Sequence, residues 1–224
     1  MDAIAVVPRR SLLFVPGLRP DRMRKALTAG ADCVCVDLED AVAVGQKDEA
    51  RALTLPVFAE ARPANCEAVV RINSLDTLHG LRDIEALTKL DKLPDAIMLP
   101  KVKAAAEIHL LDELLQGASE KLKYHVIVET NAGLENIYSI AGASKRIVSL
   151  LFGAVDMSAD LRCRRTQSAL LYARSRTVHA AATFELDVMD VPHINLDDMA
   201  GVVSGAGLPP RDGCSWERGG HSPP

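Results

Sequence analysis

Short apolar runs alternate with longer amphipathic stretches along most of this chain. Each run is rich in β-branched or aliphatic residues, and most have at most one polar residue before the end, which is typical of a strand buried on both faces. The first six runs end at or near a polar residue, and a seventh is weaker. They cover residues 11–16, 33–37, 68–73, 96–100, 124–129, 148–152 and 186–191.

Helical patterns fill the segments between these runs. The clearest example is 78–90, where Leu81, Ile84, Leu87 and Leu90 share one face. The other predicted helices cover residues 19–29, 46–62 with a kink at Pro56, 103–115, 134–140 and 166–183. Strands that alternate with helices in this way predict a parallel sheet built from βαβ units.

Polar residues gather at the carboxyl ends of the predicted strands, as they do at the active-site face of a (β/α)8 TIM barrel. We therefore predict an α/β fold of the TIM-barrel type. A doubly wound sheet is the second choice, because no G-x-G-x-x-G motif follows the first strand. With about seven strands rather than eight, the predicted barrel over residues 1–200 is incomplete.

Residues 201–224 have a different composition. They contain six glycines and four prolines and show no helical or strand periodicity. Such a segment buries too little apolar surface to offset its ordering entropy. We expect an irregular, disordered tail here.

Charge and composition narrow the functional classes. The net charge is −4 and the pI is near 5.9, which does not indicate a surface for nucleic acid or anionic membranes. No apolar run reaches about 18 residues, and the acidic start is not a secretory signal. Five scattered cysteines favour a reducing compartment, and Cys33, Cys35 and His125 are expected in the core. We expect a cytoplasmic protein.

Two carboxylates carry the strongest chemical signal. Glu129 ends one apolar run and Asp156 follows the next. On consecutive parallel strands the two carboxylates would point into the same opening at the carboxyl ends of the strands, called the mouth below. An unpaired buried charge is costly there. Oxygen ligands of this kind suit a hard cation, so we predict that Glu129 and Asp156 hold Mg²⁺.

The same mouth should contain two cations and two further acids. Arg71 and Lys101 end the third and fourth strands, and Glu39 and Asp40 follow the second. Arg71 offers a bidentate fork for a carboxylate, as a 2-oxo or 2-hydroxy acid bound to the metal would require. The metal would stabilise charge on oxygen as a carbon–carbon bond breaks or forms. Phosphoryl-transfer sites use the same parts, so this reasoning leaves the reaction class open.

Seven motifs occur along the chain in the order in which one known family has them. They are Arg10-Ser-Leu-Leu-Phe-Val-Pro-Gly17, Asp37-Leu-Glu-Asp-Ala-Val42, Val70-Arg-Ile-Asn73, Leu99-Pro-Lys101, Glu129-Thr130, Phe152-Gly-Ala-Val-Asp156 and Leu170-Leu-Tyr-Ala-Arg-Ser-Arg176. Over roughly residues 10–200 the chain resembles the citrate lyase beta-subunit-like family, relatives of malyl-CoA and citramalyl-CoA lyases.

The resemblance implies a TIM barrel in a homo-oligomer, a trimer or a hexamer, and an Mg²⁺-dependent carbon–carbon lyase. Its substrate would be a 2-hydroxy acyl thioester of CoA or an acyl carrier, and its products a 2-oxo acid and an acyl thioester. Glu129 and Asp156 match the metal ligands, and Arg71 the arginine that holds the substrate carboxylate. Glu39 and Asp40 match acids that support the metal's waters. Gly153, Ala154, Val155 and Lys101 are assigned to substrate binding.

The chain departs from the family after Gly201. Relatives continue with a helix, an eighth strand and a helical extension, and no such pattern follows here. We therefore expect a truncated or frameshifted gene product. Two alternatives to the lyase stay open: a non-catalytic remnant or partner subunit that binds metal and oxo-acid only, and a phosphoenolpyruvate-using barrel enzyme.

Overall fold

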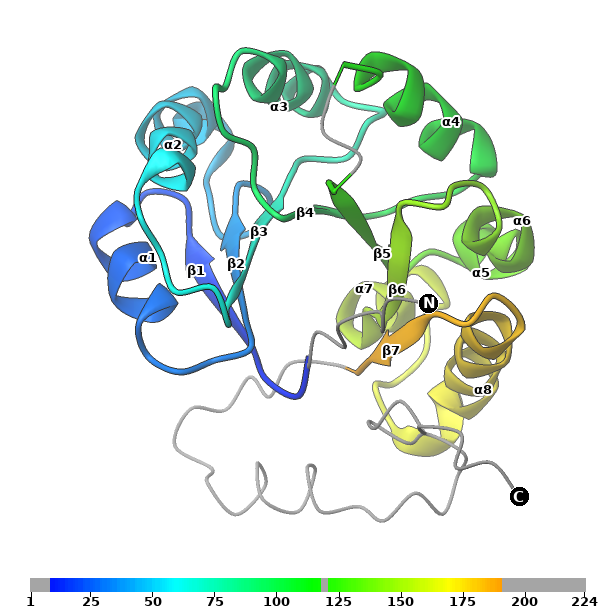
Figure 1. Ribbon diagram of the computed structural model, residues 1–224. Helices are drawn as coiled ribbons and strands as arrows, with labels where there is room; N and C mark the ends of the chain where they lie inside the picture. The colour runs from blue at the N-terminus through cyan, green and yellow to red at the C-terminus, as the bar shows by residue number, and fades with distance from the viewer. Residues whose placement is uncertain (1–8, 118–120, 191–224) are drawn as a thin grey trace, which may run out of the picture.

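The chain folds around one curled parallel sheet (Figure 1). The computed structural model describes residues 9–117 and 121–190. Within them seven strands pair in sequence order, each with the next along the chain. The strands are β1 (Leu12–Pro16), β2 (Cys33–Asp37), β3 (Glu67–Arg71), β4 (Ala96–Leu99), β5 (Lys123–Val128), β6 (Ile147–Phe152) and β7 (Asp187–Met189).

Helices connect successive strands and lie outside the curl of the sheet (Figure 1). Thr77, Thr130 and Thr166 cap three of them, because each hydroxyl accepts a hydrogen bond from the amide three residues on. The α-helices are α1 (Pro20–Leu27), α2 (Lys47–Thr54), α3 (Leu78–Thr88), α4 (Ala105–Leu114), α5 (Asn131–Glu135), α6 (Ile137–Ala141), α7 (Ala154–Asp160) and α8 (Gln167–Thr183). Two 3₁₀ turns, η1 (Val44–Gln46) and η2 (Leu55–Ala59), flank α2.

Strands β2 to β6 are almost entirely buried on both faces, which explains their mostly apolar sequences. Alternate residues of each strand contribute to two separate apolar cores. The larger core packs the outer face of the sheet against the helices. The smaller lies inside the curl and consists of Cys35, Val69, Ala96, Met98, Ile127, Leu151 and Met189.

A buried polar cluster lies inside the curl at the amino ends of the strands. Arg9 donates to both carboxylate oxygens of Glu67 on β3, at 2.7 and 2.8 Å, and to Asp187 on β7 at 2.7 Å. His125 lies 3.3 Å from Glu67 and 2.6 Å from Ser149. Since β1 and β7 are not paired within the described residues, Arg9 links the two sides of the opening.

The predicted incomplete barrel of about seven parallel strands is confirmed. His125, Cys33 and Cys35 are fully buried, as expected of core residues. The predicted tail over 201–224 lies outside the described residues. None of the helices in the described part of the chain is long and apolar enough to cross a membrane.

Two helix predictions were inaccurate, and one helix was missed. The helix predicted over 46–62 ends at Thr54 and passes into the 3₁₀ turn η2, because Pro56 cannot donate an amide hydrogen bond within a continuing α-helix. The segment 134–140 consists of two short helices that meet at Asn136. Helix α7 was not predicted at all.

Replacement of Arg9 by Met should lower the free energy of unfolding by about 3 kcal/mol, because it leaves the buried carboxylate of Glu67 without its main cation. Arg10 is the matched control. Its side chain is 73% exposed where it meets Asp32, whereas that of Arg9 is 10% exposed. We expect Arg10→Met to cost less than about 1 kcal/mol. Urea unfolding measures the free energy of unfolding of both variants. Equal losses of stability in the two would contradict the proposed link across the opening.

Candidate functional site

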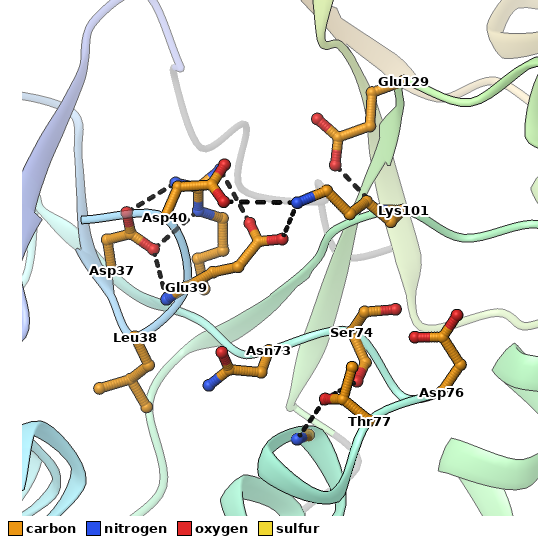
Figure 2. Close-up of polar contacts among 12 residues, drawn as sticks. Asp37, Leu38, Glu39, Asp40, Asn73, Ser74, Asp76, Thr77, Lys101 and Glu129 are labelled. Carbon is orange, nitrogen blue, oxygen red and sulfur yellow. Dashed lines mark hydrogen bonds and ion pairs between the residues drawn. The ribbon is translucent and has the colours of Figure 1, made fainter. Parts of the chain in front are cut away.

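Five of the predicted site residues converge at the carboxyl ends of neighbouring strands. Glu39 and Asp40 follow β2, Arg71 ends β3, Lys101 follows β4 and Glu129 follows β5. Figure 2 shows Glu39, Asp40, Lys101 and Glu129 around one space. The arrangement follows from the parallel sheet, in which all strands end at the same rim.

Arg71 is held by the carboxylate of Asp37, the last residue of β2. Asp37 is 3% exposed, and its two oxygens accept from Arg71 Nε at 2.8 Å and Nη2 at 2.6 Å. The same carboxylate accepts from the amides of Glu39 and Ala41. Arg71 also lies over the ring of Phe14, 5.3 Å from its centroid. Its Nη1 atom, 3.2 Å from Glu39, is the part of the fork that faces the other acids.

A buried lysine supports the acidic turn from behind. Lys47, on the first turn of α2, donates from Nζ to the carbonyl oxygens of Leu38 at 2.9 Å and Glu39 at 2.5 Å. Only 7% of Lys47 is exposed. Backbone carbonyls held in this way fix the direction in which Glu39 and Asp40 leave the turn.

Lys101 contacts acids through both its backbone and its side chain (Figure 2). Its amide donates to Glu129 Oε1 at 2.8 Å. Its Nζ atom donates to Glu39 Oε1 at 2.6 Å and lies 3.3 Å from Asp40 Oδ1. The residue has a φ of 54°, a left-handed conformation that is uncommon for any residue with a side chain.

Glu129 is a buried acid in an acidic neighbourhood. It is 3% exposed, and burial together with the negative charges of Glu39 and Asp156 raises its pKa to about 8. Gly153 leaves room for the carboxylate, since a Cβ atom there would lie 2.6 Å from Glu129 Oε2. The carboxylate is therefore fixed in place but not neutralised by a full positive charge.

Asp156 lies on a helix rather than in a loop after the strand. It is half-buried in the first turn of α7, a helix that begins at Ala154 directly after Gly153. Ala154 is buried and Val155 is exposed. The assignment of Gly153, Ala154 and Val155 to substrate binding stays a prediction.

The acids fit a hard cation. Glu39 Oε2 is buried without a hydrogen-bond partner, and Glu129 carries a raised pKa beside Asp156. No three His, Cys, Asp or Glu side chains within residues 9–117 and 121–190 form a complete ligand set. Mg²⁺ does not need one, because it usually keeps several waters and takes one or two protein carboxylates. Glu129 and Asp156 would hold it.

The buried support beneath Asn73 was not predicted. Asp83 on α3 is fully buried and accepts from the Asn73 amide, the Asn73 side chain and Arg51. The sequence did contain a signal for this buried acid. Asp83 sits on the apolar face of α3 with Ile84 and Leu87, where an acid needs buried partners.

Glu129 should make the metal-free protein less stable as the pH rises. The unfolded chain releases this proton near 4.5 and the folded chain near 8. The folded state thus holds the extra proton between these values, so the free energy of unfolding falls across this window and stays low above it. Glu129→Gln should remove this loss and stabilise the protein by about 1–3 kcal/mol above pH 8.

Urea unfolding in EDTA at pH 5, 7 and 9 measures this effect. The exposed Glu113 on α4 is a suitable control, because Glu113→Gln should leave the pH profile of the wild type unchanged. A Glu129→Gln profile parallel to that of the wild type would show that Glu129 is ionised in the fold.

Gly153→Ala should lower the free energy of unfolding by about 1–3 kcal/mol, since the new methyl group meets the Glu129 carboxylate. Gly45→Ala is the control, because no atom lies within 4 Å of the added Cβ. We expect it to change stability by less than about 0.5 kcal/mol. Similar losses in both variants by urea unfolding would contradict the close fit at Gly153.

Known proteins share this fold and sequence. The chain is 36% identical to the citrate lyase subunit beta of Leuconostoc mesenteroides over 86% of its length and 66% of that protein's. It is 29% identical to the human mitochondrial citramalyl-CoA lyase over 88% of its length and 63% of that protein's. It therefore spans about two thirds of the length of these relatives.

A solved structure agrees in fold. The citrate lyase beta subunit of M. tuberculosis complexed with oxaloacetate and magnesium has a TM-score of 0.73 and 32% identity, over 92% of this chain and 87% of that one. Residues 10–209 match the HpcH/HpaI aldolase/citrate lyase family, and the chain belongs to that family.

Proposed function

We propose that this chain is an Mg²⁺-dependent carbon–carbon lyase. It would cleave, or form by condensation, a 2-hydroxy acyl thioester, with a 2-oxo acid and an acyl thioester on the other side of the reaction. The observation that carries the proposal is the buried carboxylate of Glu129, whose pKa is raised by burial and by the negative charges of Glu39 and Asp156. Relatives named citrate lyase and citramalyl-CoA lyase support the reaction class.

Arg71 would bind the carboxylate of the 2-oxo acid. Asp37 holds its Nε and Nη2 atoms, so Nη1 is the part directed at the substrate. A guanidinium fixed in this way loses little side-chain entropy when the substrate binds. Mg²⁺ at Glu129 and Asp156 would supply a Lewis acid for the oxygen that gains charge as the bond breaks.

The acidic turn would order the water around this site. Glu39 is buried, and its Oε2 atom has no hydrogen-bond partner within the described residues. That oxygen can accept from a water molecule on the metal or from the substrate hydroxyl. Asp40, whose side chain is 52% exposed, lies nearer the solvent.

The carrier of the acyl group and the assembly belong to the same proposal. One M. tuberculosis relative has been solved with magnesium, acetoacetate and coenzyme A, which favours a CoA thioester over an acyl-carrier protein. We propose a homo-oligomer, a trimer or a hexamer, as the resemblance implies.

The test separates binding from cleavage. Calorimetry with Mg²⁺ and then with pyruvate should show that both ligands bind. In a separate assay, the protein should release a 2-oxo acid from malyl-CoA or citramalyl-CoA, and this release should depend on Mg²⁺. Glu129→Gln and Asp156→Asn should each lower kcat/KM by at least about 100-fold, since each removes a metal ligand. Glu113→Gln, on the exposed side of α4, should have no effect.

Each failure has a distinct meaning. A folded wild type that binds neither Mg²⁺ nor pyruvate would refute the site assignment. Binding without thioester cleavage would instead support the alternative of a non-catalytic metal and oxo-acid binder. Turnover of phosphoenolpyruvate would favour the third alternative.

A further inference from the structure

We propose that Lys101 is a positioning residue that keeps the carboxylates of Glu39 and Asp40 from ligating the metal, so that its open positions stay available to the 2-oxo acid. The inference rests on the proposed function in one respect, the metal at Glu129 and Asp156. It concerns what prevents nearby acids from filling that site.

The backbone of Lys101 is the first observation. Three non-glycine residues in the described part of the chain have a positive φ: Lys101, Arg162 and Glu185. Arg162 and Glu185 follow the ends of α7 and α8, where a left-handed residue commonly closes a helix. Lys101 instead follows β4 at the mouth of the sheet. The left-handed conformation of Lys101 is therefore not explained by the end of a helix.

The left-handed conformation aims the two ends of the residue at different acids. The amide donates to Glu129, and the ammonium group reaches Glu39 and Asp40 (Figure 2). Glycine would provide the amide contact without the cost of about 1–2 kcal/mol that a side chain incurs here. What lysine adds over glycine is the ammonium group, and this group contacts the acidic turn.

Each oxygen of Glu39 lies beside a cation, although only Oε1 accepts a hydrogen bond within the described residues. Oε1 accepts from Lys101 at 2.6 Å, and Oε2 lies 3.2 Å from Arg71 Nη1. Asp40 Oδ1 lies 3.3 Å from Lys101. A carboxylate paired with an ammonium group has less to gain from a metal ion, so both acids act on the site without entering the coordination shell.

Without Lys101, four carboxylates would compete for one ion. Mg²⁺ requires six ligands in near-octahedral geometry. Coordination by both Glu39 and Asp40, added to Glu129 and Asp156, would leave two of the six positions, and a chelating 2-oxo acid could use them only if they were adjacent. The surplus negative charge would also repel the substrate carboxylate. Lys101 counteracts both effects.

The inference predicts opposite changes for two ligands. In Lys101→Met and Lys101→Gly, Mg²⁺ alone should bind at least about threefold more tightly, because a repelling charge is gone and two acids are freed. Pyruvate at saturating Mg²⁺ should bind at least about tenfold more weakly. Lys101→Arg keeps the charge and should stay within about threefold of the wild type for both.

Isothermal titration calorimetry gives both constants on the full chain. Lys103→Met is the control, because Lys103 forms an ion pair of similar length, 2.7 Å, with the exposed Asp76 and should change neither constant. Lys101→Gly guards against misfolding, since it accepts the left-handed backbone and keeps the amide bond to Glu129.

A purely structural Lys101 would change the two affinities together or not at all, and either result would overturn the inference. Weaker Mg²⁺ binding in Lys101→Met would overturn it as well. These outcomes leave the proposed function intact as long as Glu129→Gln abolishes Mg²⁺ binding. A wild type that binds no Mg²⁺ would instead refute the proposed metal site, and this inference with it.

Discussion

The site depends on how buried carboxylates share too few cations. Asp37, Glu39 and Glu129 are each at least 95% buried, and Asp40 and Asp156 stand beside them. An unpaired buried charge costs several kcal/mol, so Asp37, Glu39 and Glu129 each need a partner or a proton. Asp37 takes Arg71, Glu39 takes Lys101 and part of Arg71, and Glu129 is left with one backbone amide. The negative charge of Glu129 is therefore not balanced by a cation of the protein, and we propose that a metal cation balances it.

The scaffold makes this crowding possible. The parallel sheet brings five strand ends to one rim, and buried groups behind the rim hold the loops. Lys47 fixes the carbonyls of the acidic turn, and Asp83 fixes Asn73 after β3. Because these supports come from the first turn of α2 and the buried face of α3, the βα connections contribute to the site as well as to the fold.

The sequence was sufficient to predict the elements that burial marks with a run of apolar residues. Strands buried on both faces show as apolar runs, so all seven could be located, and Glu129 and Arg71 stood out at their ends. The sequence was insufficient where one residue breaks a local rule. Lys47 resembles an exposed lysine at a helix start, and only the tertiary fold buries it. Helix α7 was missed because its first residues, Ala154 and Val155, continue the apolar run of β6.

The two ends of the barrel interior show how electrostatics locates function in this fold. Glu67 at the amino end and Glu129 at the carboxyl end are both buried glutamates on the same sheet. Burial favours the neutral form of Glu67, yet its contact with His125 and its hydrogen bonds from Arg9 lower its pKa well below the usual range. At Glu129 burial is reinforced by Glu39 and Asp156, and the pKa rises to about 8. The amino end is therefore a structural cluster of paired charges, whereas the carboxyl end is where we propose that a cation binds.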